Sequence, residues 1–209
     1  MPGAFVVVEG PDGAGKTTLV ERLAGRLKRR GVDPVVVREP GGTPLAEEAR
    51  RLAFDPPFAA SPAAELFLML AARADLVAKI IRPALDAGRL VLSDRFDLST
   101  EAYQIAGRAL PRDEVLYANR IATGGLKPDL TIVLDVPVSV GRARQAQARK
   151  DLDRMERESD PLHERVRTAF AKASGPGVFH LDAGRPPEAV ESDAWALFEK
   201  RFGETFPQP

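Results

Sequence analysis

One stretch of the sequence decides the fold: Gly10-Pro11-Asp12-Gly13-Ala14-Gly15-Lys16-Thr17-Thr18. It matches the pattern G-x-x-x-x-G-K-[ST] and lies between an apolar run and a helical pattern, which is the setting of a phosphate-binding loop (P-loop). Glycines let backbone N–H groups turn toward an anion, and the following helix adds the positive end of its dipole. Lys16 supplies a charge for the β- and γ-phosphates of a nucleoside triphosphate, and the Thr17 hydroxyl is placed to ligate Mg²⁺. A glycine-rich turn without a ligand is the alternative, which the flanking strand and helix disfavour.

Working outward from this loop, short apolar runs alternate with helical patterns. The apolar runs are residues 4–8, 35–37, 90–92, 130–136 and 178–181. They are largely apolar rather than alternating, which predicts strands buried on both faces. The alternation of strands and helices predicts an α/β fold, with a five-stranded parallel sheet, right-handed crossovers and helices on both faces.

Local signals set the expected helix ends. The first helix follows the P-loop and ends at Gly31. Ser61 and Pro62 form an N-cap and a first helical position, and they open a long helix that runs to about residue 82, where Pro83 interrupts it. Further helices are expected over residues 97–106, 112–123, 138–147, 161–173 and 187–201. No stretch resembles a domain linker, so a single domain is expected over residues 1–209.

The composition excludes several classes of protein. The 209 residues include 30 basic and 30 acidic side chains, a balance that a strongly basic nucleic-acid binder would not show, so any phosphate-binding charge must be local. The absence of cysteine excludes disulfides, thiolate zinc sites and cysteine nucleophiles. No apolar run approaches the roughly 18 residues that span a bilayer, and the first run stops at Glu9 without a basic segment before it. We therefore expect a cytoplasmic protein with neither a membrane nor a nucleic acid as partner.

Two arginines follow strands on the same edge of the predicted sheet. Arg38 comes after the second strand, and Asp94 with Arg95 ends the third. The carboxyl ends of parallel strands face the ligand crevice, so both arginines would approach the P-loop. Each could instead form a surface salt bridge, but two arginines beside a P-loop favour a second anion site.

The segments around these arginines resemble bacterial thymidylate kinase. The matching segments are Arg38-Glu39-Pro40-Gly41-Gly42-Thr43, Asp94-Arg95-Phe96-Asp97-Leu98-Ser99-Thr100-Glu101-Ala102-Tyr103-Gln104, Pro128-Asp129-Leu130-Thr131, Leu134-Asp135-Val136 and Leu152-Asp153-Arg154-Met155-Glu156. They occur in the family's order, and the resemblance covers about residues 4–183. It implies a P-loop fold of the nucleoside-monophosphate kinase type with a short lid. The implied reaction transfers the γ-phosphoryl group of ATP to dTMP, giving dTDP and ADP for dTTP biosynthesis, with Mg²⁺ as cofactor and a homodimer as the working form.

The resemblance also implies roles for individual residues at the reacting phosphates. Arg38 and Arg95 match the arginines that hold the dTMP phosphate, and Lys16, Asp94 and Arg95 would also be catalytic. Asp94 matches the carboxylate linked to Mg²⁺, so Thr17 and Asp94 form the expected metal site. Asp12 matches the P-loop acid that faces the acceptor nucleotide.

Further positions match the family's nucleoside contacts. Arg73 matches the arginine that hydrogen-bonds thymine, and Tyr103 matches the tyrosine beside the sugar's 2′ position, which disfavours ribose. The base-reading positions are Ser99, Thr100 and Gln104, and a helix presents Thr100, Tyr103 and Gln104 on one face. The family usually stacks a phenylalanine on thymine, whereas this chain has Met69 there. A thioether makes favourable contacts with rings, although Met69 could instead belong to the core.

The charge-dense residues 142–158 lie where such kinases carry a mobile lid, although a solvated helix face would have the same composition. The family includes a variant with glycine in the P-loop and a catalytic arginine in the lid, while the other form has arginine in the P-loop. Gly13 fits the first variant. Arg149 is the expected lid arginine, with Arg144 and Arg154 as competitors. By resemblance and position, Asp182 after the last strand is expected to contact adenine.

Two other functions stay open at the level of sequence. The first is a kinase for dUMP, CMP or a nucleoside, which a panel of acceptors would distinguish. The second is a P-loop ATPase that changes state on binding DNA or a protein, and its hydrolysis would respond to that partner rather than to dTMP.

Overall fold

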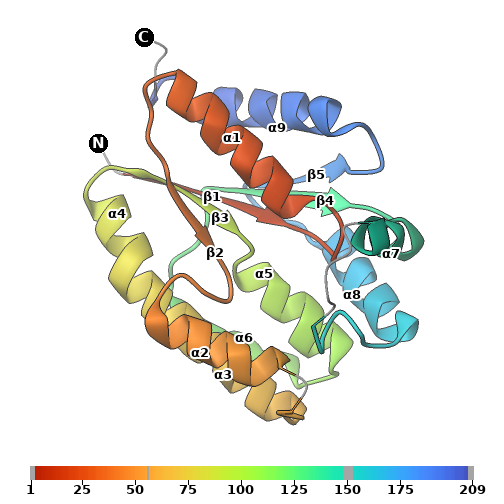
Figure 1. The fold of residues 1–209 in the computed structure, drawn as a ribbon. Coiled ribbons are helices and arrows are strands. Elements are labelled where there is room, and N and C mark those ends of the chain that lie inside the picture. The colour runs from red at the N-terminus through yellow and green to blue at the C-terminus, as the bar shows by residue number, and fades with distance from the viewer. Residues whose placement is uncertain (1–2, 56, 148–152, 207–209) are drawn as a thin grey trace.

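The computed structural model describes residues 3–55, 57–147 and 153–206, and its centre is a parallel sheet (Figure 1). The strands are β1 (Ala4–Glu9), β2 (Val35–Arg38), β3 (Leu90–Asp94), β4 (Leu130–Asp135) and β5 (Val178–Asp182). They form one five-stranded sheet in the order β2-β3-β1-β4-β5, and every pairing is parallel. The predicted sheet is therefore confirmed, and its register sets Arg38 and Val8 on either side of Asp94.

Burial differs between the central and the edge strands. The side chains of β1 are buried along its whole length, and alternate residues face opposite layers. Ala4, Val6 and Val8 join the core on one face, and Phe5 and Val7 join the core on the other. The prediction that all five strands are buried on both faces is wrong for β2 and β5. Both are edge strands, which have a neighbouring strand on one side only. Val36 is 47% exposed and Phe179 is 40% exposed.

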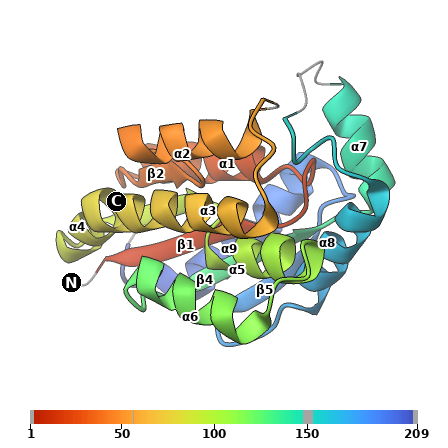
Figure 2. The same ribbon diagram turned by 90° about the horizontal axis from the view of Figure 1, so that it is seen from below.

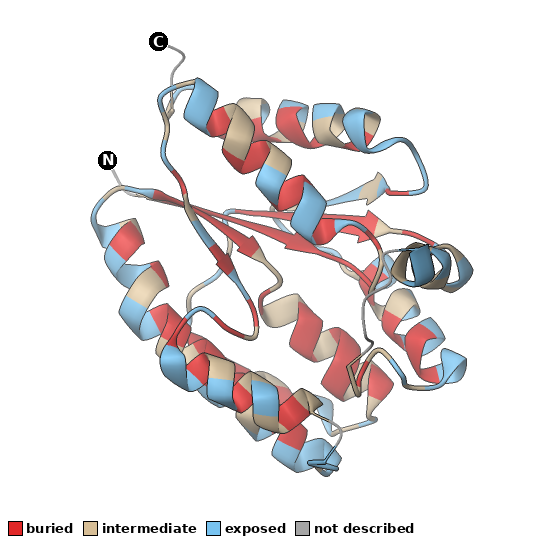
Figure 3. Ribbon diagram, in the orientation of Figure 1, coloured by how far each residue is buried: buried red, intermediate tan, exposed pale blue. Residues whose placement is uncertain are grey.

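Helices cover both faces of the sheet, as Figures 1 and 3 show. On one face lie α1 (Lys16–Arg29) and α9 (Pro187–Phe202), which pack Leu23, Trp195 and Phe198 against the strands. On the other face lies the long helical segment that begins at Pro62. Three further helices, α6 (Arg112–Thr123), α7 (Val138–Gln147) and α8 (Asp160–Lys172), lie close to the predicted ranges (Figure 2).

The long helical segment does not end at Pro83, contrary to the prediction. It comprises α3 (Pro62–Leu76), a π-helical turn η1 (Val77–Ile81) and α4 (Arg82–Asp86). Pro83 stands in the first turn of α4, where a missing N–H costs little. Val77 and Ile81 are buried under the sheet, so packing holds the segment together. Its start is as predicted, because Ser61 Oγ accepts a hydrogen bond from Ala64 N at 3.3 Å.

Helix α2 (Pro44–Phe54) was not predicted, although the sequence carries its start signal. Thr43 Oγ1 accepts from Ala46 N at 3.1 Å, and Pro44 occupies the first turn, which is a common N-terminal arrangement. The expected helix over residues 97–106 is present in two parts. α5 (Asp97–Thr100) is α-helical, and η2 (Glu101–Gly107) is π-helical. No helix in the described part of the chain has the length and apolarity needed to cross a bilayer.

Candidate active site

The P-loop joins β1 to α1 and packs directly against helix α7. Gly13 has a φ of 74°, and a Cβ there would lie 2.3 Å from the carbonyl oxygen of Gly141. A Cβ on Gly141 would lie 2.5 Å from the carbonyl oxygen of Asp12. Both distances are too short for a side-chain atom, so two glycines allow the loop and the helix to touch through their backbones. The Nζ of Lys16, the first residue of α1, donates to Pro11 O at 2.7 Å.

A cavity of about 520 Å³ opens in front of the P-loop and contains most of the predicted site residues. Those that line it are Asp12, Gly13, Gly15, Lys16, Thr17, Thr18, Arg38, Met69, Arg73, Asp94, Arg95, Ser99, Thr100, Tyr103 and Gln104. Gly10, Pro11 and Ala14 belong to the same loop but do not line the cavity. One hollow therefore adjoins both the P-loop and the predicted acceptor residues.

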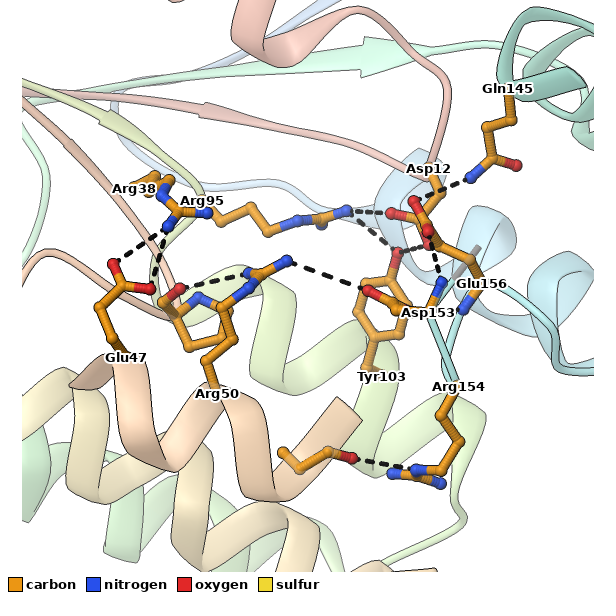
Figure 4. Close-up of polar contacts among 12 residues, drawn as sticks. Asp12, Arg38, Glu47, Arg50, Arg95, Tyr103, Gln145, Asp153, Arg154 and Glu156 are labelled. Atoms are coloured by element: carbon orange, nitrogen blue, oxygen red, sulfur yellow. Dashed lines mark hydrogen bonds and ion pairs between the residues drawn. The ribbon is translucent and has the colours of Figure 1, made fainter. Parts of the chain in front are cut away.

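Arg95 is the centre of the cavity's polar contacts (Figure 4). Its Nη2 donates to Asp12 Oδ1 and, at 3.2 Å, to the Tyr103 hydroxyl. Its Nη1 donates to Gly10 O at 3.1 Å and to Ser99 Oγ at 3.0 Å. Tyr103 in turn donates to Asp12 Oδ2 at 2.8 Å. The guanidinium is thus fixed between the P-loop and η2.

The backbone of Arg95 is left-handed, with a φ of 75°, which is costly for a residue with a side chain. Neighbouring groups hold it in place. Its N–H donates to Val8 O at 2.9 Å, and its carbonyl accepts from Ser93 Oγ at 2.6 Å. Strain held in this way places the side chain over the cavity rather than along the strand.

Burial and charge shift the pKa values of the P-loop groups. Burial and the nearby Arg95 charge lower the pKa of Lys16 to about 8. Burial alone would raise the pKa of Asp12, but the charges of Arg95 and Lys16 and the Tyr103 hydroxyl outweigh it, so that pKa lies below its usual value. Asp12 is therefore ionised at neutral pH, and it neutralises part of the local positive charge.

Hard oxygen donors meet at the mouth of the P-loop. Thr17 Oγ1 donates to Asp94 Oδ2 at 2.5 Å, so a hydroxyl and a carboxylate oxygen lie together beside the phosphate site. Mg²⁺ prefers such ligands and takes substrate phosphate oxygens as others. The donor set predicted from sequence therefore fits the metal.

A second arginine beside Arg38 was missed at the sequence level. Arg50 on α2 lines the cavity, where its Nη1 donates to Pro40 O at 3.2 Å and its Nη2 lies 3.9 Å from Asp153 Oδ2 (Figure 4). Arg38 also lines the cavity and pairs with Glu47 at 3.0 Å. Burial and the charge of Arg38 lower the pKa of Arg50. Arg50 was missed because α2, which carries it, was not predicted.

Arg73 is buried in a network that fixes its guanidinium. Its Nε donates to Glu39 Oε2 at 2.6 Å, and its Nη1 donates to Thr100 Oγ1 at 2.6 Å and Asn119 Oδ1 at 2.7 Å. Its Nη2 donates to Phe96 O at 2.7 Å. Both Arg73 and Met69, which also lines the cavity, project from α3.

Two further carboxylates were missed as members of the site. Glu9, at the end of β1, is fully buried, and its Oε1 accepts from Phe96 N at 2.8 Å and Ser99 N at 3.1 Å. Glu39 lines the cavity, and its buried Oε1 has no hydrogen-bond partner among the residues that the structure describes. Burial raises the pKa of Glu39 to about 7, against the opposing effect of Arg73. An acid at the end of an apolar strand was the available signal for Glu9.

The described part of the predicted lid borders the cavity through Arg144, Gln145, Asp153, Met155 and Glu156. Arg144 Nη2 donates to Ala183 O at 2.8 Å, so α7 also touches the turn after β5.

The three candidate lid arginines differ in position. Arg144 lines the cavity. Arg154 does not, because it is paired with the buried Glu65. Arg149 lies outside the described residues. Asp182 does not line the cavity, and its Oδ1 accepts from Gly184 N at 2.8 Å. It ends β5 on the P-loop side of the sheet, so its contact with adenine stays a prediction.

Together the P-loop, the arginines that line the cavity beside it and the parallel sheet are features of a P-loop kinase of the nucleoside-monophosphate class. Comparison with known proteins identifies the family. The thymidylate kinase family model matches residues 8–194. The chain is 47% identical to a thymidylate kinase of Pseudomonas putida (strain GB-1) over 201 residues, which cover 94% of this chain and 95% of that protein.

Two other relatives are also thymidylate kinases. The chain is 49% identical over 201 residues to a thymidylate kinase of Pseudomonas entomophila (strain L48). It is 47% identical over 203 residues to that of Ectopseudomonas mendocina (strain ymp). Both alignments cover 94% of this chain and 95% of the relative. The chain belongs to the thymidylate kinase family, and it phosphorylates dTMP to dTDP with ATP as phosphoryl donor.

Proposed function

We propose that the cavity holds ATP and dTMP end to end, with the ATP phosphates on the P-loop and the dTMP phosphate among Arg38, Arg50 and Arg95. The observation that carries this proposal is that Lys16 and the Arg95–Asp12–Tyr103 cluster line the same cavity. Two anions repel one another, so alignment and positive charge are what the site must supply.

In the proposed step an oxygen of the dTMP phosphate attacks the γ-phosphorus of ATP. The bond to the β–γ bridging oxygen breaks, and ADP leaves with that electron pair. The acceptor phosphate is already anionic, so the step needs no general base. Neither His163 nor His180 lines the cavity, and His180 Nε2 contacts Ala173 O at 2.7 Å.

Each cation has a proposed task in this step. Lys16 neutralises the β- and γ-phosphates, and Arg95 draws the acceptor toward the P-loop while Asp12 and Tyr103 hold its guanidinium. Mg²⁺, bound at Thr17 and Asp94, would offset charge on the ATP phosphates. The lid supplies a further arginine: Arg149 by resemblance, with Arg144 as the candidate that lines the cavity.

The nucleoside end of the acceptor site is formed by α3, α5 and η2. Arg73 and the side chains of Ser99, Thr100 and Gln104 would read the base, and Met69 would pack against its ring. Support comes from the fact that all of these residues line the cavity and that Arg73 donates a hydrogen bond to Thr100. Tyr103, fixed by Asp12 and Arg95, would exclude a 2′-hydroxyl.

A panel of acceptors tests this proposal. ADP release is measured with dTMP, dUMP, CMP, thymidine or double-stranded DNA, for the wild type and for Lys16→Ala. We expect dTMP to give the highest kcat/KM and Lys16→Ala to lose at least about 100-fold in kcat, since it removes a charge that stabilises the transition state. ADP release that DNA stimulates, or that is as fast without any acceptor, would favour an ATPase with another role.

We also propose that the working form is a homodimer in the cytoplasm without a nucleic-acid partner. Exposed apolar side chains on adjacent helices support the dimer. Phe67 on α3 is 64% exposed, and Tyr117 and Ile121 on α6 are 60% and 66% exposed. A buried cluster that includes Leu70 and Val115 joins α3 to α6, so the two helices that carry these exposed side chains are neighbours. The even charge balance supports the absence of nucleic acid.

A further inference from the structure

Glu65 is a buried carboxylate that the proposed reaction does not use. It lies in the first turn of α3, and its side chain has an exposed fraction of 0%. Arg108 donates to both of its oxygens, at 3.2 Å and 2.9 Å, and Arg154 donates to Oε2. A buried carboxylate needs such partners to remain charged. Burial alone would raise the pKa of Glu65, but the hydrogen bonds from Arg108 and Arg154 outweigh it, so that pKa lies below its usual value.

Glu65 also touches the acceptor site, through Gln104. Gln104 Nε2 donates to Glu65 Oε1 at 3.0 Å. An ionised carboxylate only accepts hydrogen bonds, whereas a carboxamide has a donor end and an acceptor end. The amino group of Gln104 must therefore face Glu65. The same carboxamide without this neighbour could turn over and present either end.

The consequence falls on the atom that Gln104 presents to the cavity. Gln104 lines the cavity beside Arg73 and Thr100, and its side chain is nearly buried. Among the described residues, no donor hydrogen-bonds Gln104 Oε1. That carbonyl oxygen is thus available as an acceptor on the wall assigned to the base.

Arg73 supplies the complementary donor. A guanidinium has five N–H groups, and the contacts to Glu39, Thr100, Asn119 and Phe96 use one on Nε, both on Nη1 and one on Nη2. One Nη2 N–H remains for a ligand. A 4-keto pyrimidine offers an acceptor at O4 and a donor at N3, whereas a 4-amino pyrimidine reverses both.

We propose that Glu65 is a specificity-determining positioning residue, which turns the Gln104 carbonyl toward N3–H and so selects 4-keto over 4-amino pyrimidine nucleotides. This inference rests on the proposed role of Gln104 at the base. Glu65 does not touch the nucleotide, and it acts by removing one of the two orientations that Gln104 could adopt.

The test compares dTMP with 5-methyl-dCMP, which keeps the 5-methyl group and differs only at positions 3 and 4. In Glu65→Gln, the neutral amide can either donate to or accept from Gln104, so both orientations of Gln104 become available. We expect the ratio of kcat/KM for dTMP over 5-methyl-dCMP to fall about tenfold, the order of the net contribution of one hydrogen bond. We expect the change to lie in KM, because the contact is remote from the reacting phosphates.

Glu158→Gln is the matched control. Glu158 Oε1 lies 2.6 Å from Arg108 Nη1 and 3.8 Å from Arg154 Nη1, so it shares the arginines of Glu65 but does not touch Gln104. Its ratio should stay at the wild-type value. An equal fall in Glu158→Gln would mean that a loosened ion network explains the effect, and it would overturn the inference.

Gln104→Ala separates this inference from the site assignment. If Gln104→Ala lowers the ratio and Glu65→Gln does not, Glu65 has no role in selection while the proposed base site stands. An unchanged ratio in Gln104→Ala would remove both. If Glu65→Gln does not fold, the double variant Glu65→Gln with Arg154→Met replaces it. This variant removes one of the two arginine charges that pair with Glu65, and its ratio is compared with that of Arg154→Met alone.

Discussion

At the scale of single residues, the site depends on buried charges whose pKa values are displaced. Lys16 is the clearest case, because burial and Arg95 lower its pKa to about 8. Only the protonated amine attracts phosphate. In the proposed mechanism, the free enzyme therefore loses the form that binds ATP as the pH rises through 8.

The first prediction concerns this proton. The kcat/KM for ATP should fall about tenfold per pH unit well above pH 8, because one deprotonation is involved. Binding of ATP at pH 8.5 should take up a proton, since the phosphates favour the charged amine. Calorimetry in two buffers with different ionisation enthalpies measures that uptake. An observed binding enthalpy that is the same in both buffers would contradict the assignment.

The second prediction concerns Glu39, whose pKa burial raises from 4.5 to about 7. The folded state then binds more protons than the unfolded state between these values, so the wild type loses stability as the pH rises from 4.5 to 7. Glu39→Gln cannot titrate and should avoid that loss, which is at most about 3 to 4 kcal/mol for a pKa difference of about 2.5 at about 1.36 kcal/mol per pKa unit. Urea unfolding at pH 5, 6, 7 and 8 gives the difference between the two proteins. The free energy of unfolding of Glu39→Gln minus that of the wild type should rise up to pH 7 and then level off. A difference that is independent of pH would oppose this explanation.

At the scale of elements, strand β1 fixes the start of helix α5. Glu9 on β1 accepts hydrogen bonds from Phe96 N, Ser99 N and Ser99 Oγ, the last at 2.6 Å. Free N–H groups at a helix start need such acceptors. The contact also fixes the turn that holds Arg95 in its left-handed conformation.

The third prediction follows from this contact. Glu9→Gln keeps one acceptor oxygen but loses the charge, so we expect the kcat/KM for dTMP to fall about 10–100-fold through misplacement of Arg95. The KM for ATP should change much less, because the hydrogen bonds of Glu9 go to Phe96 and Ser99 and not to the P-loop residues Lys16 or Thr17. Steady-state kinetics with each substrate varied separately makes the comparison. Equal losses for both substrates would indicate general damage to the fold.

The elements also show which features a sequence reveals. The strands and the P-loop were predictable, because their signals are short local patterns, whereas the pairing of Thr17 with Asp94 was implied only by the resemblance to a family. Contacts such as Glu9 with Ser99 or Glu65 with Arg154 join residues about 90 positions apart, and no local pattern reports them. Pro83 failed as a stop signal because burial of Val77 and Ile81 outweighs a local preference. The missed helix α2 had a usable signal in Thr43-Pro44.

At the scale of the whole molecule, the exposed apolar side chains of α3 and α6 carry the dimer proposal. Exposed clusters of large apolar residues are typical of interfaces. The fourth prediction is that Ile121→Arg shifts the protein toward a monomer, because it buries a charge in the contact. Phe179→Arg, on edge strand β5, is the control with a similar change on another exposed residue.

Light scattering after size exclusion, over a range of concentrations, reports the mass of each variant. The dimer proposal requires the mass of Ile121→Arg to fall at low concentration while Phe179→Arg keeps the wild-type value. A wild-type protein of monomer mass at every concentration would remove the proposal.

The close backbone contact of Gly13 with Gly141 has an evolutionary meaning. In the family form with an arginine in the P-loop, the corresponding position carries a side chain, and here a Cβ at Gly13 would meet the backbone of α7. A single mutation at that codon would push the helix away before the new cation could reach a phosphate. An arginine at this position therefore requires a different path of α7, so the loop residue and the helix would have to change together.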